Sequence, residues 1–295
     1  MKQKRKIEPF DIFCYFTMII VTLVMLLPVW YCIAGSFNDG TDYLRGGVYF
    51  WPREFTAANY KAVFRDSSIF RAFEVTIAKS IIGTLSCLIV TALAAYAMTR
   101  PALKGKGFYA PFMTVTMYFG GGLIPYFLLI DNLGLYDSFW VYIIPGLFNV
   151  WNMIIIRSFF ADLPPGLVEA AKIDGAGEYR IFFQIVLPLS KPVLATIILF
   201  SVVGHWNSYF DSMMYTSSEN LQTIQFFLKK LITDPGASGS LASSVAAAIP
   251  DSARKVTPQT IKLAAMVITS LPIVCIYPML QKYFAKGVMV GSVKG

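Results

Sequence analysis

Long apolar stretches without an ionised residue constrain this chain more than any other feature. Hydrophobic residues make up 56% of its 295 residues and charged residues only 14%, whereas a soluble domain carries about 25% charged residues. Six stretches approach the roughly 20 apolar residues that a helix needs to cross a bilayer. They are residues 12–38, 80–99, 107–130, 138–156, 192–210 and 263–281. The sequence therefore predicts an all-α membrane protein with six transmembrane helices.

Two further charge-free stretches do not qualify as spans. Residues 235–250 are mostly Gly, Ser and Ala, which gain too little on leaving water. Residues 181–190 are apolar but have about half the length that a span needs. We expect residues 181–190 to form a helix that lies in or near the membrane interface.

The position of the basic residues indicates how the chain is oriented. A formal net charge of +8 would suggest a nucleic-acid partner in a soluble protein, but this chain is mostly apolar. Four of its first six residues are basic, the connection 100–106 carries three basic residues, and the connection 131–137 carries none. Because basic loops stay in the cytoplasm, we expect a multi-pass protein of the inner (cytoplasmic) membrane. We further expect an uncleaved first span, both termini in the cytoplasm, lipid contact and no nucleic-acid partner.

The connection 157–191 is the one long loop on the predicted inner side. Pro164 and Pro165 end the preceding span and favour a new helix start, since proline is tolerated in the first helical turn. The pattern predicts a short helix over 166–173, a break at Asp174-Gly175 and a second helix over 177–187 that ends near Pro188. The small residues of this loop would let a partner approach the backbone closely.

The same loop resembles the EAA signature of ABC importer permease subunits. The matching residues are Glu169-Ala170-Ala171, Gly175, Ile185 and Leu187-Pro188, at the spacing of that signature. The longer string is similar to the carbohydrate-uptake (MalG-like) branch, and the end of the chain, 281–295, looks like permeases for oligosaccharides and polysaccharide fragments, including alginate-type acidic ones. The resemblance implies a type I ABC importer permease fold with a first span and outer loop at 1–70, a permease core at 71–284 and a cytoplasmic tail at 285–295.

The resemblance also implies how such a chain would work. Residues Glu169, Ala170, Ala171, Asp174 and Gly175 would form a coupling helix that contacts an ATP-binding subunit. The implied partners are a second, homologous permease, two ATP-binding subunits and an extracytoplasmic sugar-binding protein, and the implied mechanism is alternating access. The chain has no phosphate-binding loop of the G-x-x-x-x-G-K-[ST] type. We therefore expect a non-catalytic subunit without a cofactor, whose partner ATPase subunits use ATP and Mg²⁺.

Candidate path residues are polar or aromatic side chains inside the apolar stretches. Trp206, Asn207, Tyr209 and Asp211 follow one another near the end of the fifth stretch, and sugars are bound by aromatic faces together with amides and carboxylates. An aromatic belt at the outer interface is the alternative for the two aromatic residues. Tyr118 and Phe119 precede three glycines and Pro125 in the third stretch, where we expect a broken helix beside the path or, alternatively, close helix packing.

The remaining polar residues of the spans narrow the choice of function. Lys79 lies at the outer edge of the second predicted span, where we expect its side chain to snorkel to the interface; the alternative is contact with an acidic sugar. His205 is the one histidine and the four cysteines lie in predicted spans, so we expect neither a metal site nor a catalytic residue. An ion-coupled secondary sugar transporter is the alternative function, although titratable groups occur only at span edges.

Overall fold

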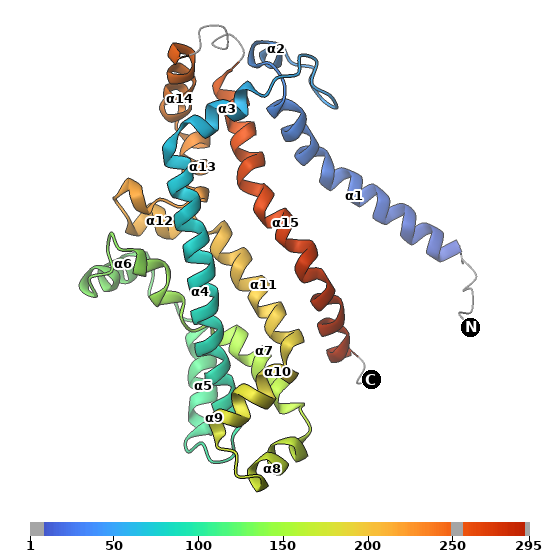
Figure 1. Cartoon of the computed structure of the whole chain (residues 1–295), viewed down its shortest axis with the longest axis vertical. Coiled ribbons are helices and arrows are strands. Elements are labelled where there is room, and N and C mark those ends of the chain that lie inside the picture. Colours follow the sequence, from blue (N-terminus) through green and yellow to red (C-terminus); the bar gives the residue numbers. More distant parts are fainter. Residues whose placement is uncertain (1–8, 249–255, 293–295) are drawn as a thin grey trace. The chain divides into compact units, whose positions relative to one another are not determined.

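The computed structural model describes residues 9–248 and 256–292, and its regular elements over these ranges are helical, with one isolated bridge between Asn38 and Phe55. The chain divides into two compact units, one formed by 1–69 with 228–270 and the other by 70–227 with 271–295. Three helices contribute to both units: α4 (Ser67–Thr99), α13 (Ile224–Thr233) and α15 (Pro258–Ser292). Figure 1 shows the path of the chain.

The first unit contains one long apolar helix and several short ones. Its own elements are α1 (Pro9–Ser36), α2 (Gly40–Leu44), α3 (Ala58–Arg65) and α14 (Pro235–Ala248). None of the most apolar 18-residue window of α1 is buried, so α1 has the exposure of a helix surrounded by lipid.

A buried polar network fixes the C-terminal end of α1. The side-chain amide of Asn59 donates to the carbonyls of Ser36 and Asn38, both at 2.9 Å, and its oxygen accepts from Thr260 Oγ1 at 2.7 Å. A Cβ at Gly35 would lie 2.6 Å from Leu263 Cδ1. Because buried polar groups are costly unless they are paired, this network favours a single arrangement of the helix end.

The second unit contains the remaining helices around a core of apolar side chains. Its elements are α5 (Lys106–Thr116), α6 (Leu123–Asn132), η1 (Phe139–Tyr142), η2 (Ile144–Gly146), α7 (Val150–Ala161), α8 (Pro165–Ile173), α9 (Glu178–Ile181), η3 (Phe182–Val186), α10 (Leu187–Leu189), α11 (Lys191–Asn207), α12 (Phe210–Tyr215) and η4 (Glu219–Leu221). Residues of α4, α7, α9, η3 and α11 form one buried cluster. Within this unit, α8 and α9 lie at one end, and α6 and α12 lie at the other (Figure 1).

The number of predicted spans is confirmed only in part. Among the described residues, three helices are long and apolar enough to cross a membrane: Pro9–Ser36, Ser67–Thr99 and Pro258–Ile276. Two bent pairs, Phe139–Gly146 with Val150–Ala161 and Glu178–Leu189 with Lys191–Asn207, raise that number to five if each pair is one span. The prediction of six spans is therefore not confirmed by helix length.

Two predicted spans are interrupted, each at helix-breaking residues. The third stretch, 107–130, consists of α5 and α6 separated by a segment at Gly120–Gly122, as the glycine run predicts, and Gly122 has a φ of +86°. The fourth stretch, 138–156, is not one straight helix as expected. It begins as two 3-10 turns around Pro145 and bends by 46° before α7, because proline removes a helical donor and crowds the preceding turn.

The second helix predicted for the connection 157–191 is present. Helical structure runs from Glu178 to Leu189, with a π-helical turn over Phe182–Val186, and it ends one residue after Pro188, as expected. An 81° bend then leads into α11. Ile181, Phe182 and Val186 are buried in the core cluster, so one face of this helix packs against protein, and its position near the membrane interface stays a prediction.

Candidate functional site

The predicted short helix is present as α8. Pro164 and Pro165 occupy its N-cap and first position, and it ends at Ile173. The N–H of Gly175 donates to Lys172 O at 3.0 Å and the N–H of Ala176 donates to Ala171 O at 2.9 Å, which is the Schellman arrangement of a helix end. Gly175 has a φ of +76°, a conformation that glycine adopts without steric cost. The break predicted at Asp174-Gly175 is therefore present.

The five predicted contact residues lie on two sides of this helix and turn. Glu169, Ala170, Asp174 and Gly175 are exposed, whereas Ala171 is 7% exposed and belongs to the core cluster. The buried Ala171 holds α8 against the unit, and the four exposed residues form a surface on which another protein could pack. Contact of these five residues with an ATP-binding subunit stays a prediction.

Exposed apolar side chains lie beside these residues, and the sequence reasoning did not find them. Ile173 is 86% exposed and Tyr179 is 78% exposed. Covering an apolar side chain this exposed, at the tip of a helical hairpin, with a partner protein is energetically favourable. A signal was present in the sequence, because Ile173 is an apolar residue at the last position before the Asp174-Gly175 turn, where the helix ends.

Glu178 joins α8 to α4. Its Oε1 is 2.8 Å from Lys172 Nζ on α8, and its Oε2 accepts from the Tyr96 hydroxyl of α4 at 2.5 Å. The Arg100 guanidinium lies 4.3 Å from the centre of the Tyr96 ring. The Lys172 hydrogen bond, followed by the Tyr96 hydrogen bond, lowers the pKa of the Glu178 carboxyl from its ordinary value. The carboxylate is thus charged at neutral pH and connects the two helices, a link that we call the Glu178 clamp.

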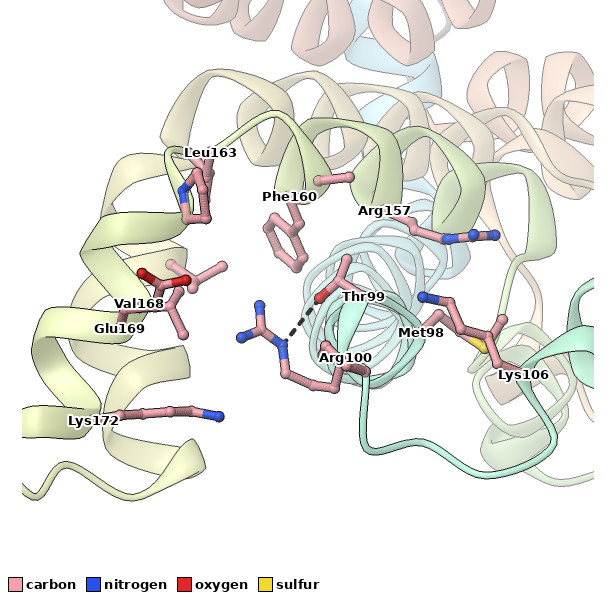
Figure 2. Close-up of a pocket in the computed structure, with 14 residues that line it drawn as sticks. Met98, Thr99, Arg100, Lys106, Arg157, Phe160, Leu163, Val168, Glu169 and Lys172 are labelled. Atoms are coloured by element: carbon pink, nitrogen blue, oxygen red, sulfur yellow. Dashed lines mark hydrogen bonds between the residues drawn. The ribbon is translucent and has the colours of Figure 1, made fainter.

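A cavity of about 450 Å³ lies beside the clamp (Figure 2). Its walls come from the end of α4 with the following loop, from α7, from α8 and from η3. Arg100 and Lys172 extend toward the same space from facing elements, and Glu169 lies on the same helix as Lys172 (Figure 2). The predicted contact residue Glu169 therefore borders this cavity and is also exposed on the surface.

A second cavity, of about 420 Å³, is lined by residues of α4, the segment 145–149, α7, α11, the loop after α11 and α12. We call it the path cavity because the predicted path residue Asp211 lines it. Asp211, Ser208, Asn152 and His205 provide polar groups to its lining, and Phe148, Phe200 and other residues line the remainder. Asp211 Oδ2 accepts from Ser208 Oγ at 2.9 Å. The lining combines aromatic faces, an amide and a carboxylate, which are the groups that bind sugars.

The structure separates the other predicted path residues from this cavity. Trp206 is 3% exposed, and its ring lies 6.2 Å from the Phe73 ring. It borders a different, apolar cavity. Asn207 and Tyr209 are exposed next to Asp211 but do not line the path cavity. Tyr118 and Phe119 are 79% and 78% exposed in the segment between α5 and α6. The sequence reasoning missed His205 and Asn152 as lining residues, because the cavity is formed by segments distant in sequence.

The expectation that Lys79 snorkels to the interface is wrong. Lys79 is 1% exposed, its Nζ donates to the Ser208 carbonyl at 3.2 Å and lies 4.8 Å from the centre of the Tyr142 ring. The reason is that α4 begins at Ser67, well before the predicted span, so Lys79 lies inside the helix and not at its end. A buried ammonium held in this way supports the loop after α11 and does not face the path cavity.

His205 packs closely against α4. A Cβ at Gly83 would lie 2.6 Å from the imidazole ring, so the absence of a side chain at Gly83 allows α4 and α11 to approach. No group of three or more His, Cys, Asp or Glu side chains in the described part of the chain could hold a metal ion.

These features define a class of protein, namely helical membrane proteins that display a short, exposed helix before a glycine turn. The family model of binding-protein-dependent transport system inner membrane components matches residues 8–290, and the chain belongs to this family. It is 39% identical to Protein LplC of Bacillus subtilis (strain 168), over 93% of this chain and 91% of that protein. It is 36% identical to the polygalacturonan/rhamnogalacturonan transport system permease protein YtcP of the same organism, over 97% and 98%.

A solved structure has the same fold. A crystal structure of a bacterial ABC transporter involved in the import of the acidic polysaccharide alginate contains a chain that aligns with a TM-score of 0.86 and 29% identity, covering 96% of this chain and 99% of that chain. The type I ABC permease fold that the EAA resemblance implied is therefore confirmed, and the chain is a membrane permease component.

Proposed function

We propose that this chain is the transmembrane permease subunit of an ATP-driven, binding-protein-dependent importer of carbohydrate. The substrate class is oligosaccharides or polysaccharide fragments, including acidic ones. The support comes from the relatives: one is named for polygalacturonan and rhamnogalacturonan transport and the solved neighbour for alginate import. The groups that line the path cavity are compatible with sugar hydroxyls and ring faces.

The observation that carries the proposal is the exposure of α8 and its turn. Glu169 offers a charged acceptor, Gly175 permits close backbone approach, and the exposed Ile173 offers an apolar anchor. In the proposed orientation this hairpin lies in the cytoplasm, together with both termini, and it fits into an ATP-binding subunit. The Glu178 clamp then passes the movement of that subunit to α4.

The proposed cycle is alternating access. An extracytoplasmic binding protein delivers the sugar, a second permease completes the path, and two ATP-binding subunits hydrolyse Mg-ATP to switch the path between its outward and inward states. This chain contributes no covalent chemistry and binds no cofactor in the proposal. Its own contribution is to hold α8 at a fixed position relative to α4 and α11.

The test is whether α8 binds the ATPase subunit through its exposed residues. The full importer is expressed with a tag on the ATPase subunit, and recovery of the permease is compared for Ile173→Ser and Glu169→Gln. The control is Ser240→Ala, which removes an exposed hydroxyl of α14. The two α8 variants are expected to insert normally but to lose most ATPase recovery and uptake. Normal recovery with both variants would overturn the proposed docking role.

A further inference from the structure

The cavity beside the Glu178 clamp is lined by four basic side chains and one acidic side chain. The basic residues are Arg100, Lys106, Arg157 and Lys172, and the acid is Glu169 (Figure 2). They come from the loop after α4, the start of α5, α7 and α8. The cavity thus gathers positive charge from four chain segments, three of which lie outside the α8 hairpin of the proposed docking.

Part of this positive charge is not balanced by carboxylates. Lys172 is paired with Glu178 at 2.8 Å. Over the residues that the structure describes, the ion pairs include none from Arg100, Lys106 or Arg157. Arg100 is close enough to Glu178 to help lower the pKa of that carboxyl. Lys106 and Arg157, both half-buried, have one carboxylate in the lining, that of Glu169, so basic side chains outnumber carboxylates at the cavity.

Apart from Thr99, the rest of the lining is apolar. Phe160 and Val186 are 3% and 1% exposed, and Met98, Leu163 and Val168 are among the other apolar residues of the wall. A free phosphate or a nucleotide would leave this wall without a matching group. A ligand with an anionic head and an attached hydrocarbon chain would satisfy both parts of the lining.

We propose that this cavity binds the phosphate headgroup of an anionic phospholipid from the cytoplasmic leaflet. Basic pockets between membrane helices on the cytoplasmic side are known to bind anionic headgroups, and the cavity lies at the ends of α4 and α7, where a headgroup would be found in the proposed orientation. This assignment rests on that orientation but not on the sugar or on the ATPase contact.

Lipid binding would act on the moving part of the transporter. Val168, Glu169 and Lys172 of α8 form one wall of the cavity, and α4 and α7 form the opposite walls. A headgroup that neutralises Arg100, Lys106 and Arg157 holds these walls together. The lipid thereby adds to the Glu178 clamp, with which the cavity shares Lys172, in holding α8 against α4 and α7.

The direct experiment is native mass spectrometry of the full-length chain in detergent. It is titrated with phosphatidylglycerol and, separately, with phosphatidylcholine of the same acyl chains. Lys106→Gln/Arg157→Gln is compared with the control Lys104→Gln/Lys191→Gln, which removes two exposed basic residues that do not line the cavity. At about 1 kcal/mol for each basic residue near an anionic surface, the first variant is expected to bind phosphatidylglycerol about thirty-fold more weakly. The control is expected to bind as the unaltered chain does.

Further arms distinguish the source of the phosphate and guard against misfolding. Inorganic phosphate and glycerol phosphate are added as competitors, and neither is expected to displace the lipid at millimolar concentration. Lys106→Arg/Arg157→Lys keeps the charges and is expected to retain phosphatidylglycerol binding, so a loss in the glutamine variant is not a folding defect.

Each contrary outcome overturns the assignment. Equal binding of the two lipids, unchanged binding by Lys106→Gln/Arg157→Gln, or full displacement by inorganic phosphate would each do so. If the glutamine variant binds lipid normally but no longer co-purifies with the ATPase subunit, the cavity receives an acidic protein segment instead. Failure of sugar uptake alone leaves lipid binding measurable, so the two proposals fail separately.

Discussion

The Glu178 clamp gives a quantitative prediction for Glu178→Gln. The substitution keeps the shape of the side chain but removes the charge that binds Lys172 and Tyr96. The amide can still accept a hydrogen bond from the Tyr96 hydroxyl. The expected consequence is a weaker attachment of α8 to α4, with insertion and overall fold unchanged.

The magnitude follows from the two contacts. The Lys172–Glu178 pair is about half exposed on both sides, so it contributes about 0.5 kcal/mol after screening by solvent. Tyr96 is buried, and replacing a charge-assisted hydrogen bond by a neutral one costs about 1 kcal/mol. The sum of about 1.5 kcal/mol corresponds to about a tenfold larger population of the detached state.

Hydrogen exchange of backbone amides measures this population. The amides of the turn after α8 are expected to exchange about tenfold faster in Glu178→Gln, since exchange reports local opening. Tyr96→Phe is expected to show a similar increase, and adding it to Glu178→Gln is expected to add little. Arg180→Gln is the control, because Arg180 lies on α9 but bonds only to Gln184 among the described contacts. Exchange rates in Glu178→Gln within twofold of the unaltered chain would refute the clamp.

Three further predictions concern the remainder of the second unit. Lys79→Met is expected to lower the free energy of unfolding by about 1–3 kcal/mol, since the Ser208 carbonyl loses its donor. It is expected to reduce uptake of neutral and uronic oligosaccharides equally, and selective loss of the uronic substrate would contradict the structural role. Gly83→Ala is expected to push the His205 ring toward the path cavity and lower uptake, an effect that normal uptake with a normal thermal midpoint would exclude. Hydrogen bonds from Ser218 and Ser217 lower the pKa of Asp137 to about 2. The stabilisation that Asp137→Asn removes is therefore present above pH 4 and is lost as the pH falls to about 2. The difference in thermal midpoint between the two proteins should shrink over that range.

Local chain chemistry was sufficient to predict some elements. Pro164, Pro165 and the Asp174-Gly175 pair gave the start and end of α8, because these residues restrict the backbone themselves. The glycine run at 120–122 gave the break between α5 and α6 for the same reason. These features depend on neighbours in sequence, so the pattern contained them.

Features that depend on distant segments could not be predicted in the same way. The buried Lys79 donates a hydrogen bond to a carbonyl 129 positions away, and Glu178 forms the clamp because Tyr96, 82 positions earlier, lies beside it. A single sequence contains no signal for such pairs. The same holds for the path cavity, in which Asp211 was predicted and His205 and Asn152 were not.

The most direct test of the account is sugar uptake by the reconstituted importer in proteoliposomes. The permease, its partner subunits and the binding protein are supplied with a labelled acidic oligosaccharide, with ATP inside the vesicles or without it, and with an ionophore that removes ion gradients. The account predicts uptake that requires ATP and the binding protein, persists with the ionophore and is lost in Ile173→Ser. Uptake that proceeds without ATP and collapses with the ionophore would contradict it and would identify an ion-coupled transporter.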